Sequence, residues 1–122
     1  MSGEPPISEA VAERLADIMF ALSSPGRVLI LGTLLDGPRS VSYVMDMLGM
    51  EQSAVSHQLR VLREHSLVRA EKAGRRRLYA LYDDHVSTLL DAGLQHVARD
   101  HASSPSAAQR RPPSGRVVGD SS

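Results

Sequence analysis

The sequence contains no cysteine among its 122 residues. This absence excludes a disulfide framework, thiolate metal sites, iron–sulfur clusters and catalysis by a thiol nucleophile. The apolar runs are far shorter than the roughly 18 residues that a membrane-spanning helix needs. Residues 1–6 have neither the basic start nor the apolar centre of a secretory signal peptide. We therefore expect a soluble cytosolic protein with room for one domain.

Net charge is also absent, because 14 Lys and Arg residues balance 14 Asp and Glu residues when His is neutral. The distribution of these charges along the chain is uneven. Residues 1–56 hold three basic and seven acidic side chains, and residues 83–122 hold four basic and five acidic ones. Residues 57–82 hold seven basic and two acidic side chains. A segment with that excess of positive charge is typical of a surface that binds nucleic acid.

Both ends of the chain lack the apolar residues that build a core. Residues 102–122 contain no Leu, Ile, Met, Phe or Tyr, and residues 1–7 include Gly3, Pro5 and Pro6. Such segments cannot bury enough apolar surface to offset the entropy lost on ordering, so both are predicted to be disordered tails. The folded domain is predicted over residues 8–101, and a domain of that size gains stability from a partner subunit.

Hydrophobic periodicity predicts four helices, a hairpin and a last helix. The first helix is capped by Ser8 and reaches residue 22, and the second begins at Ser24-Pro25 and stops at residues 36–38. Residues 41–48 and 52–65 give the next two, separated by a stop at Gly49. Residues 68–72 and 76–81 are short extended runs on either side of a turn at residues 73–75. Helical spacing resumes after Tyr82, so the predicted fold is mainly α with a β-hairpin.

The third and fourth predicted helices form a helix-turn-helix pattern with a tight turn at Gly49-Met50. Val55, Leu59 and Leu62 give the fourth helix one apolar face for the core. Its other side carries residue types that hydrogen-bond base edges or phosphates in a major groove, and the three arginines at the hairpin tip suit phosphate or minor-groove contact. A solvated basic hairpin is the alternative for these arginines. The candidate DNA-binding residues are Gln52, Ser53, Ser56, His57, Arg60, Arg75, Arg76 and Arg77.

The last predicted helix carries histidines with an informative spacing. His85 and His96 are 11 residues apart, so they share one face to within about 20° and lie about 16 Å apart along the axis. Because metal–ligand bonds are about 2 Å long, one ion cannot reach both side chains in a single chain. An antiparallel pair of these helices across a two-fold axis brings His85 of one chain to His96 of the other. The alternative is a pair of interface histidines hydrogen-bonded to aspartates.

Several of these segments together resemble a known family. Residues 52–62 (QSAVSHQLRVL), then Leu67-Val68, Gly74-Arg75 and residues 79–81, are similar to the winged-helix core of the ArsR/SmtB family of bacterial metal-responsive transcription regulators. Residues 22–27 resemble that family's entry to its second helix. The resemblance spans residues 11–101 and is nearest to the nickel-responsive NmtR/SrnR group of actinobacteria. It implies a winged helix-turn-helix homodimer, joined through its first and last helices, that binds a palindromic operator in the cytoplasm.

The same resemblance implies a metal site on the last helix. Family members with such a site have Asp-x-His at the helix start and His-x-x-His near its end. Asp83 and His85 match the first pair and His96 matches the third ligand, whereas the fourth position is Arg99, whose guanidinium cannot ligate. Nitrogen and oxygen donors suit Ni(II) first, with Zn(II) or Co(II) as alternatives, and the missing ligand leaves open a weak site or none. The candidate ligands are Asp83, His85, His96 and, as replacements for the fourth, Asp100 and His101.

Three functions are compatible with these features, and none is enzymatic, because no phosphate-binding loop or nucleophile motif is present. The first is a dimeric transcription regulator whose operator affinity responds to a divalent metal. The second is a winged-helix regulator with weak or no direct metal sensing that a partner protein controls. The third is a protein–protein interaction module that never binds DNA, against which the arginine-rich hairpin argues.

Overall fold

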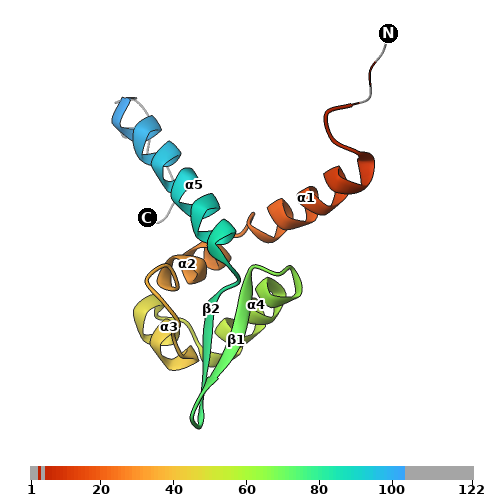
Figure 1. Ribbon diagram of the computed structural model, residues 1–122. Coiled ribbons are helices and arrows are strands. Elements are labelled where there is room, and N and C mark those ends of the chain that lie inside the picture. Colours follow the sequence, from red (N-terminus) through yellow and green to blue (C-terminus); the bar gives the residue numbers. More distant parts are fainter. Residues whose placement is uncertain (1–2, 4, 104–122) are drawn as a thin grey trace. The chain divides into compact units, whose positions relative to one another are not determined.

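A computed structural model describes residue 3 and residues 5–103 of the chain, with the side chains of residues 101–103 left out. The chain divides into two compact units, with the boundary between Ser87 and Thr88. Within the described residues the elements follow the predicted order of four helices, two strands and a helix (Figure 1). This order confirms the predicted winged helix-turn-helix class. Residues 104–122 and residues 1, 2 and 4, which belong to the predicted tails, lie outside the described residues.

The first two helices begin where their capping residues predict. Helix α1 spans Glu9–Ala21 and helix α2 spans Pro25–Thr33. The Ser8 hydroxyl accepts a hydrogen bond from the Val11 amide at 3.1 Å, and the Ser24 hydroxyl accepts one from the Arg27 amide at 3.3 Å. Each hydroxyl satisfies a backbone donor that the first helical turn leaves without a partner.

Helix α2 is shorter than its apolar run predicts. The prediction extended it to residue 35, but the helix ends at Thr33 and a tight turn follows, in which the Leu34 amide bonds to the Leu31 carbonyl at 3.0 Å. Gly37 then adopts φ +140°, a conformation that glycine tolerates and other residues rarely adopt. Ile30 and Leu31 are fully buried, as expected for a central helix.

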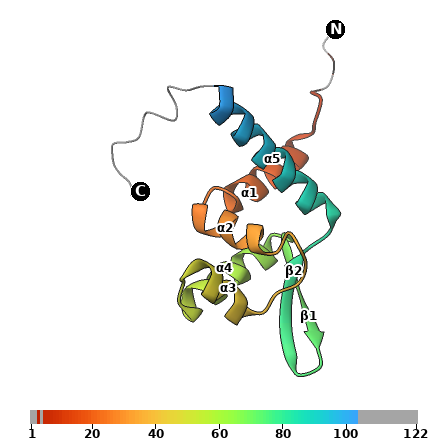
Figure 2. The same ribbon diagram turned by 90° about the vertical axis from the view of Figure 1, so that its left-hand side faces the viewer.

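Helices α3 (Val41–Leu48) and α4 (Gln52–Glu64) form the helix-turn-helix and pack against each other and against α2 (Figures 1 and 2). Gly49 ends α3 in the left-handed conformation, with φ 66°, and its amide donates to the Met45 carbonyl at 2.8 Å. The side chains packed between these helices are almost completely buried, namely Val44, Val55, Leu59 and Leu62.

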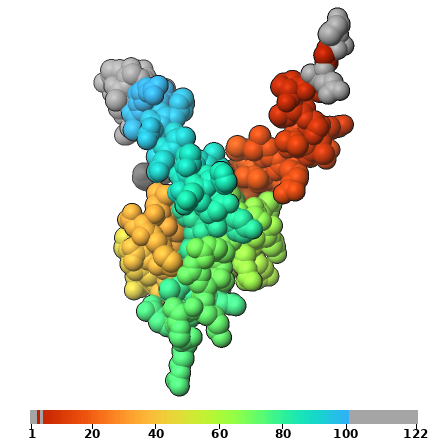
Figure 3. Space-filling model, viewed as in Figure 1, coloured from red at the N-terminus to blue at the C-terminus, as the bar shows by residue number. Residues whose placement is uncertain are grey.

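Strands β1 (Val68–Ala73) and β2 (Arg76–Leu81) form the antiparallel hairpin, paired from Val68 opposite Leu81 to Ala73 opposite Arg76. The first strand is one residue longer than predicted, so the turn consists of Gly74 and Arg75. Figure 3 shows the tip of the hairpin projecting from the rest of its unit. The other end of the hairpin is anchored, since Val68 and Ala80 are almost completely buried there.

Helix α5 spans Asp84–Ser103, two residues beyond the predicted end of the folded domain. Val86 and Leu90 are buried, whereas Leu94 and Val97 are 51% and 61% exposed. The apolar stripe of α1 is also uncovered, with Val11 52% exposed. In the part of the chain that the structure describes, no single helix has the length and apolar composition to cross a membrane. Helices α1 and α2 have that length and composition only when counted together, and an 84° bend separates them.

Candidate nucleic-acid interface and metal-ligand positions

Helix α4 separates a buried row from a polar face. Val55, Leu59 and Leu62 are at most 1% exposed. At 100° per residue, the five candidate DNA-binding residues cover an arc of about 140° on the other side of the helix. All five are exposed, and none has a side-chain hydrogen bond or ion pair within the described residues, so their donors and acceptors are available to bases. These residues are Gln52, Ser53, Ser56, His57 and Arg60.

Arg27 attaches α4 to the end of α1. Its Nε donates to the Ala21 carbonyl at 2.5 Å, and its Nη2 lies 3.4 Å from the Phe20 carbonyl. These carbonyls belong to the last turn of α1, where the helix supplies no amide four residues on. The Phe20 carbonyl also accepts from the Ser23 amide at 3.0 Å and the Ser23 hydroxyl at 2.7 Å. Arg27 Nη1 donates to Gln58 Oε1 of α4 at 3.1 Å. Sequence reasoning used Arg27 only as part of the family resemblance and did not predict this link.

The hairpin carries the predicted arginines at its tip. Arg75, Arg76 and Arg77 are exposed and have no hydrogen bond or ion pair with any described residue. Arg77 lies directly opposite Lys72 in the register, and like charges facing each other across a strand pair are destabilising. A bound phosphate relieves that repulsion, so the tip suits an anionic partner. Arg69 differs from these three, because its guanidinium pairs with Glu71 on the same strand.

Asp83 caps helix α5 and contacts His85. Its Oδ1 accepts hydrogen bonds from the amides of His85 at 3.0 Å and Val86 at 3.4 Å, and its Oδ2 lies 3.4 Å from His85 Nδ1. Burial acts to raise the pKa of Asp83, but the bonds from the His85 side chain and from the two amides outweigh it and lower that pKa. The His85 side chain is 96% exposed. The structure thus brings together the first predicted pair of metal ligands.

The other predicted ligands do not join that pair within one chain. His96 and Asp100 lie further along α5 with exposed positions, and the side chain of His101 lies outside the described residues. No three His, Asp or Glu side chains among the described residues come close enough to hold a metal ion. A site shared between two chains therefore stays a prediction.

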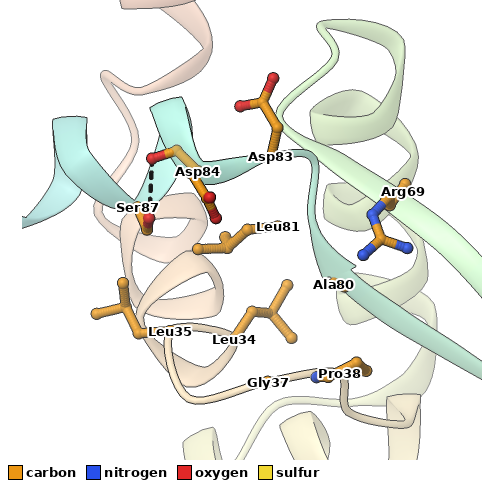
Figure 4. A pocket seen from close by; sticks show the side chains of 10 residues that line it. All are labelled: Leu34, Leu35, Gly37, Pro38, Arg69, Ala80, Leu81, Asp83, Asp84 and Ser87. Carbon is orange, nitrogen blue, oxygen red and sulfur yellow. Dashed lines mark hydrogen bonds between the residues drawn. The ribbon is translucent and has the colours of Figure 1, made fainter.

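A cavity of about 200 Å³ lies beside the start of α5 (Figure 4). Leu34 and Leu35 line its apolar side, and Asp84 and Arg69 lie at its polar edge. Asp84 takes part in the first helical turn, where its carbonyl accepts a hydrogen bond from the Ser87 hydroxyl at 2.9 Å.

The helix-turn-helix and the sequence identity to known regulators show to which family the chain belongs. The family model for bacterial regulatory proteins of the arsR family matches residues 24–70. The HTH-type transcriptional regulator NmtR of Mycobacterium tuberculosis is 46% identical over 96 residues, which are 79% of this chain and 80% of that protein. The chain belongs to the ArsR family. As a member, it is a DNA-binding transcription regulator.

Two solved structures agree with this ArsR-family assignment. The solution structure of apo-NmtR has a TM-score of 0.69 at 41% identity and covers 94% of both chains. A homodimeric winged helix-turn-helix DNA-binding domain from Mycobacterium bovis has a TM-score of 0.69 at 31% identity, covering 83% of this chain and 93% of that one. The family match at residues 24–70 contains α3 and α4, whereas the arginine-rich tip and α5 lie beyond it.

Proposed function

We propose that this ArsR-family regulator is a homodimer that binds a palindromic operator in the bacterial cytoplasm and that Ni(II) changes its operator affinity. The observation that carries the metal part is the contact between Asp83 Oδ2 and His85 Nδ1 at the exposed start of α5. A second support is the 46% identity to NmtR, because the sequence resembles the nickel-responsive members of the family.

The DNA-binding part of the proposal assigns α4 to the major groove and the arginine-rich tip to the adjoining backbone or minor groove. The unengaged polar face of α4 supports the first assignment, with Arg60 and Gln52 as base-reading residues. The exposed Arg76 and the repulsion between Lys72 and Arg77 support the second. Two copies related by a two-fold axis place two α4 helices about one turn of DNA apart, which is the reason for a palindromic site.

The homodimer uses α1 and α5. Both helices present apolar stripes that the single chain leaves open, with Met19 45% exposed on α1 and Leu94 51% exposed on α5. Exposed apolar stripes of this kind are typical of a protein–protein interface. The Mycobacterium bovis relative is described as homodimeric, which supports the same assembly for this chain.

Each metal site takes residues from both protomers. Asp83 and His85 of one chain supply the first ligands, His96 of the other supplies the third, and Asp100 or His101 replaces the ligand that Arg99 cannot provide. Imidazole and carboxylate donors suit Ni(II), with Zn(II) or Co(II) as alternatives. An ion held between the two α5 helices favours one of two dimer geometries, which differ in their affinity for DNA. The ion changes DNA affinity only as far as the ion itself binds one geometry more tightly than the other.

A second candidate function follows from Arg99. A site that lacks a fourth ligand binds its ion weakly, and a partner protein then controls DNA binding instead of the metal. The protein–protein module is the third candidate, and it predicts no DNA affinity. DNA binding that weakens steeply as salt concentration rises contradicts this third candidate.

Calorimetric titration with Ni(II) tests the shared site. We expect one ion per protomer for the wild-type dimer and none for His85→Ala or His96→Ala dimers. A mixed dimer of one His85→Ala chain and one His96→Ala chain retains a single complete site and is expected to bind one ion. If the mixed dimer binds none, the ligands do not come from two chains. If both single variants bind Ni(II) like the wild type, the site lies elsewhere and the second candidate is favoured.

A further inference from the structure

Arg39 joins the hairpin to the start of the helix-turn-helix. Its amide donates to the Tyr79 carbonyl at 2.8 Å, and the Tyr79 amide donates to the Arg39 carbonyl at 2.7 Å. This pair forms an isolated antiparallel bridge on the outer edge of β2. The next residue, Ser40, caps α3 through a 3.1 Å bond from the Tyr43 amide. The backbone of Arg39 is therefore fixed on both sides.

The side chain of Arg39 is also held in place, but its donors have no acceptor. Its Cζ lies 4.4 Å from the centre of the Tyr43 ring, so the guanidinium stacks on an aromatic face. Its Nε is buried without a hydrogen-bond partner, and no described residue accepts a hydrogen bond from the guanidinium. Buried donors in proteins are nearly always satisfied, so this side chain is incomplete as it stands.

Other arginines of the same unit show that the sequence supplies acceptors where an arginine has a structural role. Arg27 uses three of its nitrogens on the Ala21 and Phe20 carbonyls and on Gln58. Arg69 pairs with Glu71. Arg39 stacks on the Tyr43 ring, but no described residue accepts a hydrogen bond from its guanidinium. Its donors are therefore available to an acceptor from outside the chain.

The position of Arg39 indicates what that acceptor is. Tyr79 is two residues from Arg77 on β2, which is about 7 Å along the strand. Arg39 also precedes α3, and the first helix of a helix-turn-helix crosses the DNA backbone. The proposed docking places the duplex against both the hairpin tip and α4. In that docking, the protein surface between these two contacts lies against the sugar–phosphate backbone. Phosphate oxygens accept hydrogen bonds from a guanidinium.

We propose that Arg39, stacked on Tyr43, binds a DNA phosphate between the hairpin and the helix-turn-helix. The inference rests on the proposed docking of α4 and the hairpin tip, and adds a contact that carries no sequence information. Such a contact weakens binding equally on every operator variant when it is removed.

The test compares Arg39→Met with Arg39→Lys and Tyr43→Leu on one operator duplex, selected in vitro from a random-sequence library. We expect Arg39→Met to weaken binding at least about tenfold. The slope of log affinity against log salt falls by about two, since each lost phosphate contact of the dimer accounts for roughly 0.9. Arg39→Lys keeps the slope and loses part of the affinity, and Tyr43→Leu keeps the slope with a smaller loss.

Three comparisons make the outcome decisive. Arg14→Met removes an exposed arginine from α1 and is expected to leave the slope of log affinity against log salt unchanged. Sedimentation checks that every variant still forms a dimer. If Arg60→Ala and Arg76→Ala weaken binding while Arg39→Met does not, the phosphate contact is wrong and the docking stands. If all three bind like the wild type, the docking itself is wrong. A loss of affinity and thermal stability with an unchanged salt slope assigns Arg39 a structural role and overturns the inference.

Discussion

The bond between Arg27 and Gln58 predicts an energetic coupling between the end of α1 and α4, the helix that we propose reads DNA. Arg27→Met keeps an apolar stem of similar length and removes every donor, whereas Gln58→Met keeps the shape of the side chain and removes the acceptor. The perturbation therefore isolates hydrogen bonding from packing. The two residues are 31 positions apart in the chain, so the contact is tertiary and not part of a helix.

The magnitude follows from the three contacts of Arg27. The bonds to the Ala21 carbonyl at 2.5 Å and to Gln58 at 3.1 Å are short, and the contact with the Phe20 carbonyl at 3.4 Å is weak. Hydrogen bonds from charged donors contribute about 1.5–3 kcal/mol each, and partial exposure reduces that value. We expect Arg27→Met to lower the free energy of unfolding by about 2–4 kcal/mol and Gln58→Met by about 1 kcal/mol. The double variant matches Arg27→Met alone, with a coupling of about 1 kcal/mol.

Urea unfolding followed by circular dichroism measures these differences. All four proteins are compared at one chain concentration, because the stability of a dimer depends on concentration. A thermal scan gives an independent value, since 1 kcal/mol shifts the midpoint of a domain of this size by roughly 4–8 °C. Additive effects of the two substitutions, within about 0.5 kcal/mol, refute the reasoning that Arg27 stabilises α4 through Gln58.

The remaining predictions concern the operator contacts, the dimer and the cap of α5. Arg60→Ala is expected to weaken operator binding by about 1–3 kcal/mol and to relax the preference at one base pair. Arg76→Ala is expected to weaken binding evenly on all operator variants. If Arg60→Ala also weakens binding evenly on all variants, Arg60 does not read a base. Leu15→Glu puts a charge into the exposed apolar stripe of α1 and is expected to give monomers in sedimentation velocity, where an unchanged dimer argues against the α1 interface. The lowered pKa of Asp83 stabilises the fold above the ordinary value of 3.8 and that contribution disappears as pH falls through the lower folded pKa. Asp83→Asn keeps a good capping residue. We therefore expect this variant to be less stable than the wild type at neutral pH and equally stable in strong acid. A loss of stability that does not depend on pH contradicts a stabilising role of the Asp83 charge.

Local chemistry explains why most element boundaries were predictable. Ser8, Ser24 and Gly49 act through hydrogen bonds and backbone conformation within one helical turn, so the residues that decide each boundary are adjacent in the sequence. The end of α2 at Thr33 was not predictable in this way. Its apolar run continues to Leu35, and only the turn that leads to Gly37 stops the helix.

Contacts between distant residues account for what the sequence did not reveal. The Arg39–Tyr79 bridge and the Arg27–Gln58 bond join residues that are 40 and 31 positions apart, and no periodicity reports them. The polar face of α4 was predictable because one helix contains it. The contact between Asp83 and His85 was predictable because the two residues are neighbours in one turn. The metal site that joins them to His96 needs a second chain and stays a prediction.

The most direct test of the account is a titration of the operator duplex with the purified dimer, followed by fluorescence anisotropy, with and without saturating Ni(II). We expect the metal to change the dissociation constant by roughly 5- to 150-fold, the usual range of allosteric coupling. We expect that change to disappear in the His85→Ala dimer, while that dimer still binds the operator. Identical isotherms with and without Ni(II) for the wild type contradict metal control of this regulator.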